Sequence, residues 1–131
     1  MKLTASRIFA DSSFWLAYFF EENSAARSII ENSDYHLVTS VLSLFEVKRK
    51  LLQEKYAAIK IEIALNLMIS RGIIAELSPA VCLEAADVST RFKLPAIDAL
   101  IYASAKNTTA LLITSDAHFE GLENVRLLET L

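Results

Sequence analysis

Short apolar runs alternate with longer segments of helical period along this chain, and this alternation limits the folds that it can adopt. Short apolar runs suit buried parallel strands, and the segments between them are long enough to form covering helices. The sequence therefore predicts an α/β fold with a mainly parallel sheet. Strands are expected at Arg7–Ala10, His36–Thr39, Ile73–Leu77 and Ala110–Thr114, with an edge strand at Val125–Leu128.

The helical segments are less sharply bounded, because the chain holds only two glycines and two prolines. From Val41 to Ile69 the helical period runs on for longer than one globular helix, so we expect an antiparallel pair with a break near Tyr56. Gly72 is the expected stop of the second of these helices. Further helices are expected at Ser12–Phe20, Ser24–Glu31, Ser78–Arg91 and Ile97–Lys106, with a short one at Ala117–Gly121.

Length and composition indicate one folded domain, residues 1–131, since hydrophobic residues make up 53% of the chain. A lone cysteine, Cys82, excludes an intrachain disulfide and is expected to be a small buried hydrophobe. We find no apolar core of signal-peptide length near Met1 and no run of membrane-spanning length, so a cytoplasmic protein is expected. The net charge of −3 is weak evidence against nucleic-acid binding, because phosphates need only local cations.

Four acidic residues stand beside apolar segments, where a charge is costly unless something compensates it. Asp11 follows a strand, Asp116 lies two residues beyond another, and Glu46 and Asp98 lie within apolar helical segments. Each acid also has an ordinary structural interpretation. Asp11, Asp98 and Asp116 lie where helix caps are favoured, and Glu46 could pair with Lys50 one turn later.

The four acids together indicate more than three separate helix caps and one ion pair. The carboxyl ends of parallel strands form the ligand crevice of an α/β sheet, so these residues could meet there. Two carboxylates about 5 Å apart repel each other by roughly 3 kcal/mol at an effective dielectric near 20. A gathered quartet therefore needs a cation, and hard oxygen ligands favour Mg²⁺ or Mn²⁺ over zinc. Such a site can activate water and stabilise displacement at phosphorus.

Four segments of the chain resemble the PIN domain, and their order and spacing are similar to those of the VapC-type toxin ribonucleases. They are Asp11-Ser12-Ser13 after a strand, Ser43-Leu44-Phe45-Glu46-Val47, the run from Leu94 to Ile101, and the run from Leu112 to Phe119. The resemblance covers almost the whole chain. No single motif is specific, but the four motifs together make a strong pattern. The stretch from Leu94 to Phe119 is its most informative part.

The resemblance implies a three-layer α/β/α sandwich with a central, mainly parallel sheet of four to five strands. It implies a Mg²⁺- or Mn²⁺-dependent endoribonuclease that acts as the toxin of a toxin–antitoxin pair, forms a homodimer and has a cognate antitoxin. By the same resemblance the catalytic and metal-binding acids are Asp11, Glu46, Asp98 and Asp116. Polar positions near the metal match Ser12, Ser13 and Thr114.

Other residues receive weaker predictions. Arg49, Lys50 and Lys93 are the candidate phosphate contacts for RNA, although each could equally be part of a solvated helix face. Trp15, Phe14 and Phe119 are expected in the core rather than as platforms for bases. His36 and His118 lack the partner spacing of a zinc site or a catalytic triad. His118 lies two residues past Asp116, which leaves a supporting role near that acid as the less favoured alternative.

Two other classes of function remain open at this point. A catalytically inactive PIN-like module could keep the acids and act through protein or RNA partners, and the acidic segment Glu21-Glu22-Asn23 after the first helix favours it. A phosphoacceptor signalling domain also places an aspartate at a strand end. Such a domain needs a neighbouring pair of acids and a basic partner, and Asp11 has no adjacent acid.

Overall fold

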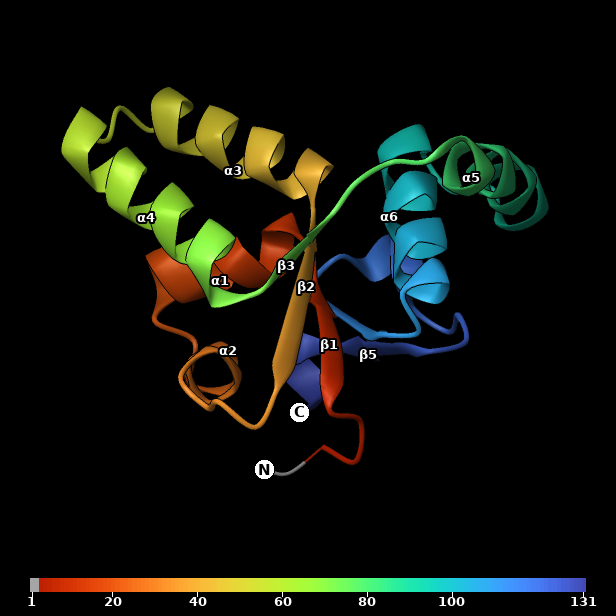
Figure 1. Cartoon of the computed structure of the whole chain (residues 1–131), viewed down its shortest axis with the longest axis horizontal. Helices are drawn as coiled ribbons and strands as arrows, with labels where there is room; N and C mark the ends of the chain where they lie inside the picture. The colour runs from red at the N-terminus through yellow and green to blue at the C-terminus, as the bar shows by residue number, and fades with distance from the viewer. Residues whose placement is uncertain (1–2) are drawn as a thin grey trace.

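A five-stranded parallel sheet lies between two layers of helices in the computed structural model, which describes residues 3–131 (Figure 1). The strand order is β3-β2-β1-β4-β5, so the chain starts in the middle strand and builds outward to both edges. This confirms the predicted α/β/α sandwich. The strands are β1 (Arg7–Ala10), β2 (His36–Ser40), β3 (Ile73–Ala75), β4 (Leu111–Thr114) and β5 (Val125–Leu127).

Six α-helices cover the sheet, four on one face and two on the other (Figure 1). The alternation of β1 explains the two cores, because Ile8 and Ala10 belong to one apolar cluster and Phe9 to the other. The first layer holds α1 (Ser12–Glu21), α2 (Ser24–Ile30), α3 (Val41–Gln53) and α4 (Ala58–Arg71). The second holds α5 (Pro79–Phe92) and α6 (Ala96–Asn107); two short 3₁₀ helices, η1 (Ala117–Phe119) and η2 (Leu128–Thr130), follow β4 and β5.

The long helical segment is interrupted where the sequence predicted, in residues 54–57, between α3 and α4. No glycine makes the turn. Lys55 instead adopts a left-handed conformation with φ of 61°, and the backbone amide of Tyr56 donates to the carbonyl of Leu51 at 3.1 Å. The two helices then pack on each other as an antiparallel hairpin.

Gly72 ends α4, as predicted, but for a different reason from the left-handed cap that glycine commonly supplies. Its backbone is extended, with φ of −153°. A Cβ atom at this position would lie 2.2 Å from the carbonyl oxygen of Leu37 on β2. Glycine is therefore required because the chain passes directly over the neighbouring strand as it enters β3.

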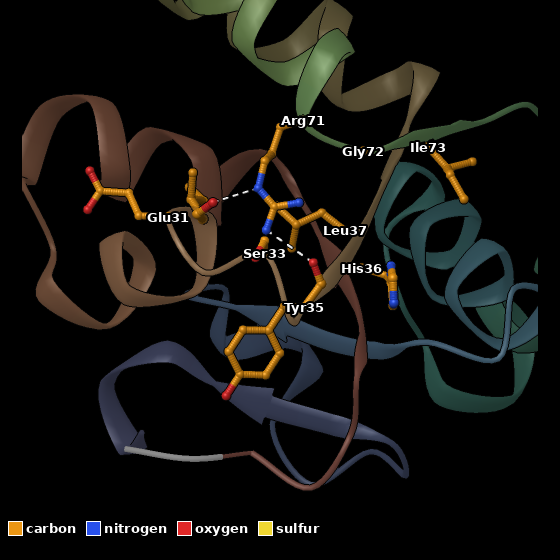
Figure 2. A pocket seen from close by; sticks show the side chains of 9 residues that line it. Glu31, Ser33, Tyr35, His36, Leu37, Arg71, Gly72 and Ile73 are labelled. Atoms are coloured by element: carbon orange, nitrogen blue, oxygen red, sulfur yellow. Dashed lines mark hydrogen bonds between the residues drawn. The ribbon is translucent and has the colours of Figure 1, made fainter.

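Arg71 ties the end of α4 to the turn between α2 and β2 (Figure 2). Its Nε donates to the carbonyl of Ile30 at 2.5 Å, and its Nη2 donates to the carbonyls of Asn32 and Tyr35 at 2.9 and 3.1 Å. Partial burial lowers the pKa of this guanidinium from its ordinary value. The pocket around it lies at the amino ends of β2 and β3, with His36 and Ile73 in its lining.

Several predictions of burial and extent were wrong. The third strand stops at Ala75 instead of Leu77. Cys82 is exposed, because the buried stripe of α5 runs through Val81, Ala85 and Val88. Phe45, expected among the apolar neighbours of Glu46, is 60% exposed. Trp15, Phe14 and Phe119 do lie in the core. Within residues 3–131, no helix has the length and apolar character needed to cross a membrane.

Candidate metal-binding active site

The carboxyl ends of β1 and β4 lie side by side, and each leads into one of the predicted acids. The two strands pair in parallel with Ala10 opposite Ile113. Asp11 follows β1 directly, and Asp116 lies two residues beyond the end of β4. The strand order therefore brings together two carboxylates that are separated by more than 100 residues of sequence, at the edge where α/β proteins bind ligands.

Asp11 is 5% exposed, and both of its carboxylate oxygens accept hydrogen bonds from the protein. Its Oδ1 accepts from the backbone amide of Phe14 at 3.0 Å and from Ser13 Oγ at 2.7 Å, and its Oδ2 accepts from Thr114 Oγ1 at 2.5 Å. The first contact is the N-cap of α1. The capping interpretation is therefore correct for Asp11 and does not exclude a second role.

Burial raises the pKa of Asp11 from 3.8 to about 6, against the opposing effect of its hydrogen bonds from Thr114, Ser13 and Phe14. The negative charge of Asp116 raises it further. A buried carboxylate that remains hard to ionise despite three donors lacks a compensating positive charge. The electrostatics are those of a site that a cation would complete.

Two hydroxyl groups bridge α1 to the end of β4 and fix the two acids relative to each other. Ser13 Oγ lies 3.1 Å from Thr114 Oγ1 and accepts from the backbone amide of Ser115 at 2.8 Å. Thr114 Oγ1 also accepts from the backbone amide of Asp116 at 2.9 Å. Of the polar positions expected near the metal, Ser13 and Thr114 contact Asp11, whereas Ser12 is half-buried at the first position of α1.

Asp98 enters the site from the first turn of α6. Its capping interpretation was wrong, because Pro95 occupies the N-cap and no side chain caps this helix. Burial, and then the charge of Asp116, raise the pKa of Asp98; Glu46 on α3 raises it further. The four predicted acids therefore form a chain of electrostatic neighbours: Asp116 acts on Asp11 and on Asp98, and Glu46 acts on Asp98.

His118 joins the site, although its position in the sequence gave a supporting role there only as the less favoured alternative. Its Nδ1 lies 3.0 Å from Asp98 Oδ2 and 3.1 Å from Asp116 Oδ1. The Oδ1 atom of Asp116 also accepts from the backbone amide of His118 at 2.9 Å, which is the cap of η1. His118 lies two residues after Asp116 in the sequence. Because Asp116 caps the one-turn helix η1, this spacing brings the His118 ring back to the Asp116 carboxylate.

The donor set fits a divalent cation. In the part of the chain that the structure describes, no lysine or arginine forms an ion pair with any of the four acids. One oxygen each from Asp98 and Asp116 and a ring nitrogen of His118 lie within 4.8 Å of one another. Carboxylate oxygens favour Mg²⁺ or Mn²⁺, so the residues present suit the ion that the four-acid pattern predicted.

The candidate RNA contacts lie on the surface and are partly engaged elsewhere. Lys50 Nζ pairs with Glu54 at 3.1 Å, which also rules out the expected pairing with Glu46 as its main contact. The Arg49 guanidinium lies 5.1 Å from the ring centroid of Phe45. Lys93 is exposed in the turn that leads into α6 and hence toward Asp98.

The fold and the acid-lined strand ends define a class of α/β protein with acidic residues at the carboxyl edge of its sheet. A family model described as the PIN domain matches residues 8–124. The chain belongs to the PIN domain family. No curated protein matches it by sequence.

Solved structures share the fold at low sequence identity. A toxin–antitoxin complex from Klebsiella pneumoniae has a TM-score of 0.76 and 19% identity, covering 92% of this chain and 97% of that one. VapBC2 from Rickettsia felis, bound to a DNA fragment from its promoter, has a TM-score of 0.74 and 16% identity, covering 92% and 96%. Mycobacterium tuberculosis VapC20, a sarcin-ricin loop cleaving toxin, has a TM-score of 0.70 and 18% identity, covering 91% and 98%. The fold is thus that of the VapC toxins.

Proposed function

We propose that the protein is a Mg²⁺- or Mn²⁺-dependent endoribonuclease and the toxin of a toxin–antitoxin pair, acting in the cytoplasm. The observation that carries the proposal is that Asp11, Glu46, Asp98 and Asp116 are electrostatic neighbours in a PIN domain and form no ion pair with a lysine or arginine among residues 3–131. Four carboxylates from β1, α3, α6 and the end of β4 suit phosphodiester hydrolysis, because the reaction needs a cation at phosphorus.

Within this function the residues have distinct tasks. Asp98 and Asp116 would hold the ion with Asp11, while Glu46 stands near Asp98 to hold it or accept a proton from water. When bound, the ion supplies an activated water and stabilises the charge that develops on the phosphate. Ser13 and Thr114 keep the Asp11 carboxylate in one orientation through bonds of 2.7 and 2.5 Å. That preorganisation removes a reorientation cost from the reaction.

The direct test is cleavage of a structured RNA by Asp98→Asn with Mg²⁺ or Mn²⁺. A hairpin carrying the sarcin-ricin loop is a sensible first substrate, since VapC20 is a toxin that cleaves this loop. The variant should keep the fold and lose at least about 100-fold in activity, the range for removal of one electrostatic group from a preorganised site. The matched control is Asp34→Asn, an exposed acid before the amino end of β2. Full activity in Asp98→Asn would exclude Asp98 from the mechanism.

An inactive PIN-like binding module is the second candidate, and two observations favour it. The net charge is −3, and Glu21 and Glu22 at the end of α1 offer no attraction to an RNA strand. Calorimetric titration with Mn²⁺ beside the cleavage assay separates the two functions. Metal binding with no turnover of any RNA would support the module.

We also propose a cognate antitoxin and a homodimer as partners. The solved relatives include a toxin–antitoxin complex and a VapBC pair. Large apolar side chains stand exposed on the helices of this chain, which is typical of surfaces that meet another chain: Phe45, Leu52, Ile59, Ile63, Ile69 and Leu83. Light scattering of the purified chain tests the dimer, and co-purification with the product of a neighbouring short reading frame tests the antitoxin.

A further inference from the structure

We propose that His118 is a direct ligand of the divalent ion through Nδ1, and that it makes the site prefer Mn²⁺ over Mg²⁺. The inference rests on the proposed function and specifies its metal centre. It assigns a nitrogen ligand to a site that is otherwise made of carboxylates. Three atoms lie close together at this site: Asp98 Oδ2, Asp116 Oδ1 and His118 Nδ1.

The spacing of these atoms is that of ligands around one small ion. Two ligands that each lie about 2.1 Å from an ion, at right angles, are about 3.0 Å apart. His118 Nδ1 lies 3.0 Å from Asp98 Oδ2 and 3.1 Å from Asp116 Oδ1. The nitrogen therefore already occupies a position adjacent to both carboxylates in an octahedral arrangement.

The direction of the imidazole agrees with this spacing. An ionised carboxylate can only accept, so in the metal-free protein the Nδ1–H group points at the two carboxylate oxygens. In the other neutral tautomer the ring proton is on Nε2, and the Nδ1 lone pair has the same direction. An ion held between Asp98 and Asp116 would therefore lie on the lone pair without rotation of the ring.

The local backbone keeps His118 in place although its side chain is 61% exposed. Asp116 Oδ1 accepts from the His118 amide at 2.9 Å, and Thr114 Oγ1 accepts from the Asp116 amide at 2.9 Å. The position of the imidazole is thus linked through two hydrogen bonds to the hydroxyl that also holds Asp11. A surface histidine without such a connection would sample many orientations.

A nitrogen ligand changes which ion the site prefers. Mg²⁺ binds through oxygen and gives up its water reluctantly, whereas imidazole suits transition metals. Losing the imidazole should therefore weaken Mn²⁺ binding much more than Mg²⁺ binding. A histidine that only hydrogen-bonds the two acids would affect both ions to a similar extent.

The test is pulsed electron paramagnetic resonance of the Mn²⁺-loaded protein, which detects ¹⁴N coupled to the ion. The chain holds two histidines, and His36 supplies the matched control because it is exposed at the opposite, amino end of β2. We expect imidazole nitrogen coupling in the wild type and in His36→Gln, and none in His118→Gln. By calorimetry, His118→Gln should lose at least about tenfold in Mn²⁺ affinity and less than about twofold in Mg²⁺ affinity.

Several results would overturn the inference. Bound Mn²⁺ without nitrogen coupling in the wild type would show that His118 is not a ligand, and persistence of the signal in His118→Gln would show the same. Equal losses of Mn²⁺ and Mg²⁺ affinity would reduce His118 to a hydrogen-bonding role. RNA cleavage measured in Mg²⁺ is read separately, so a wild type that cleaves RNA but shows no nitrogen coupling keeps the proposed function and loses only this inference.

Discussion

Asp11 caps a helix and at the same time lies where its ionised form is disfavoured until a cation binds. Three donors fix its carboxylate, yet burial and the charge of Asp116 raise its pKa to about 6. In the metal-free protein the ionised form is therefore costly. Ionisation of Asp11 therefore lowers the stability of the metal-free fold, and a bound cation would restore that stability.

The first prediction concerns pH. Because the folded-state pKa of Asp11 is raised from 3.8 to about 6, the folded state binds the extra proton between these values. Asp11 therefore favours the metal-free fold most below pH 3.8, and this contribution, about 3 kcal/mol at most, is lost as pH rises through 6. Urea unfolding with a chelator should show a more stable protein at about pH 5 than at about pH 7.5. In Asp11→Asn most of this difference should disappear, with a gain of about 1–3 kcal/mol at the higher pH.

The second prediction concerns Thr114, whose hydroxyl donates to Asp11 and accepts from the amide of Asp116. Thr114→Val keeps the shape and removes both bonds. Because the lost hydrogen bond lowers the pKa of Asp11, that pKa should rise, by about one unit if the bond is worth about 1.5 kcal/mol. The acidic limb of the pH profile for Mn²⁺ binding should move upward to the same extent. Thr114→Ser should restore the wild-type profile; an unchanged profile in the valine variant would show that the hydroxyl does not tune the acid.

Errors at the residue scale have one physical origin. Cys82 and Phe45 were expected to be buried or to crowd their neighbours, yet both are exposed. Hydrophobicity indicates that a residue can be buried, while the choice between adjacent helical positions depends on where the next element packs. His118 was missed for a related reason, because its contact with Asp98 exists only once η1 and α6 lie together.

At the scale of elements, the alternation of strands and helices was predictable because the apolar pattern of each segment agrees with the element that it forms. The α3–α4 break was located from an overlong helical period, although its left-handed residue, Lys55, is not a residue that signals such a turn. The strand order was not predictable from local pattern. It is the order that pairs β1 with β4 and so brings Asp11 to Thr114, and it depends on how all the helices pack.

The third prediction addresses the link that Arg71 makes between α4 and the α2–β2 turn. Arg71→Met keeps much of the apolar stem and removes the donors to Ile30, Asn32 and Tyr35. The free energy of unfolding should fall by about 2 kcal/mol, since bonds from a charged group are strong but water can replace part of them. Mn²⁺ affinity should stay unchanged, because this contact lies at the amino ends of the strands. Arg71→Lys should recover only part of the loss, as lysine lacks the planar fork.

The fourth prediction addresses the turn from α5 to α6. Lys93 is exposed at this turn, three residues before α6 begins at Ala96, and Asp98 lies in the first turn of that helix. If Lys93 contacts an RNA phosphate, Lys93→Gln should raise KM for RNA and reduce the slope of log affinity against log salt by about 0.7, with kcat nearly unchanged. Lys60→Gln, on α4, is the matched control. Equal salt slopes for wild type and Lys93→Gln would exclude the contact.

At the scale of the whole molecule, the site is assembled from elements that belong to both halves of the sandwich. Asp11 caps α1 and Glu46 lies on α3, and both helices pack in one apolar cluster, whereas Asp98 lies on α6, which packs in the other. A ligand that contacts these acids therefore joins the two layers. Its binding should stabilise the entire fold rather than one loop.

The fifth prediction follows from this linkage. At a free Mn²⁺ concentration of 100 times its dissociation constant, binding to the folded state alone adds about 2.7 kcal/mol. For a chain of 131 residues this corresponds to a rise in Tm of roughly 10 °C. Scanning calorimetry with and without Mn²⁺ measures the shift, and Asp98→Asn should lose most of it while Asp34→Asn retains it. A wild-type Tm that is insensitive to Mn²⁺ would contradict the assembly of a cation site from both layers.

The contact of Arg71 with four backbone carbonyls has a practical consequence for anyone altering this protein. One guanidinium secures the amino ends of the strands, whereas the opposite edge depends on hydroxyls and carboxylates. The contacts that stabilise the fold at the amino ends of the strands are thus separate from the residues of the candidate site. Substitutions that strengthen the Arg71 end are accordingly a route to a more stable variant with an unchanged site.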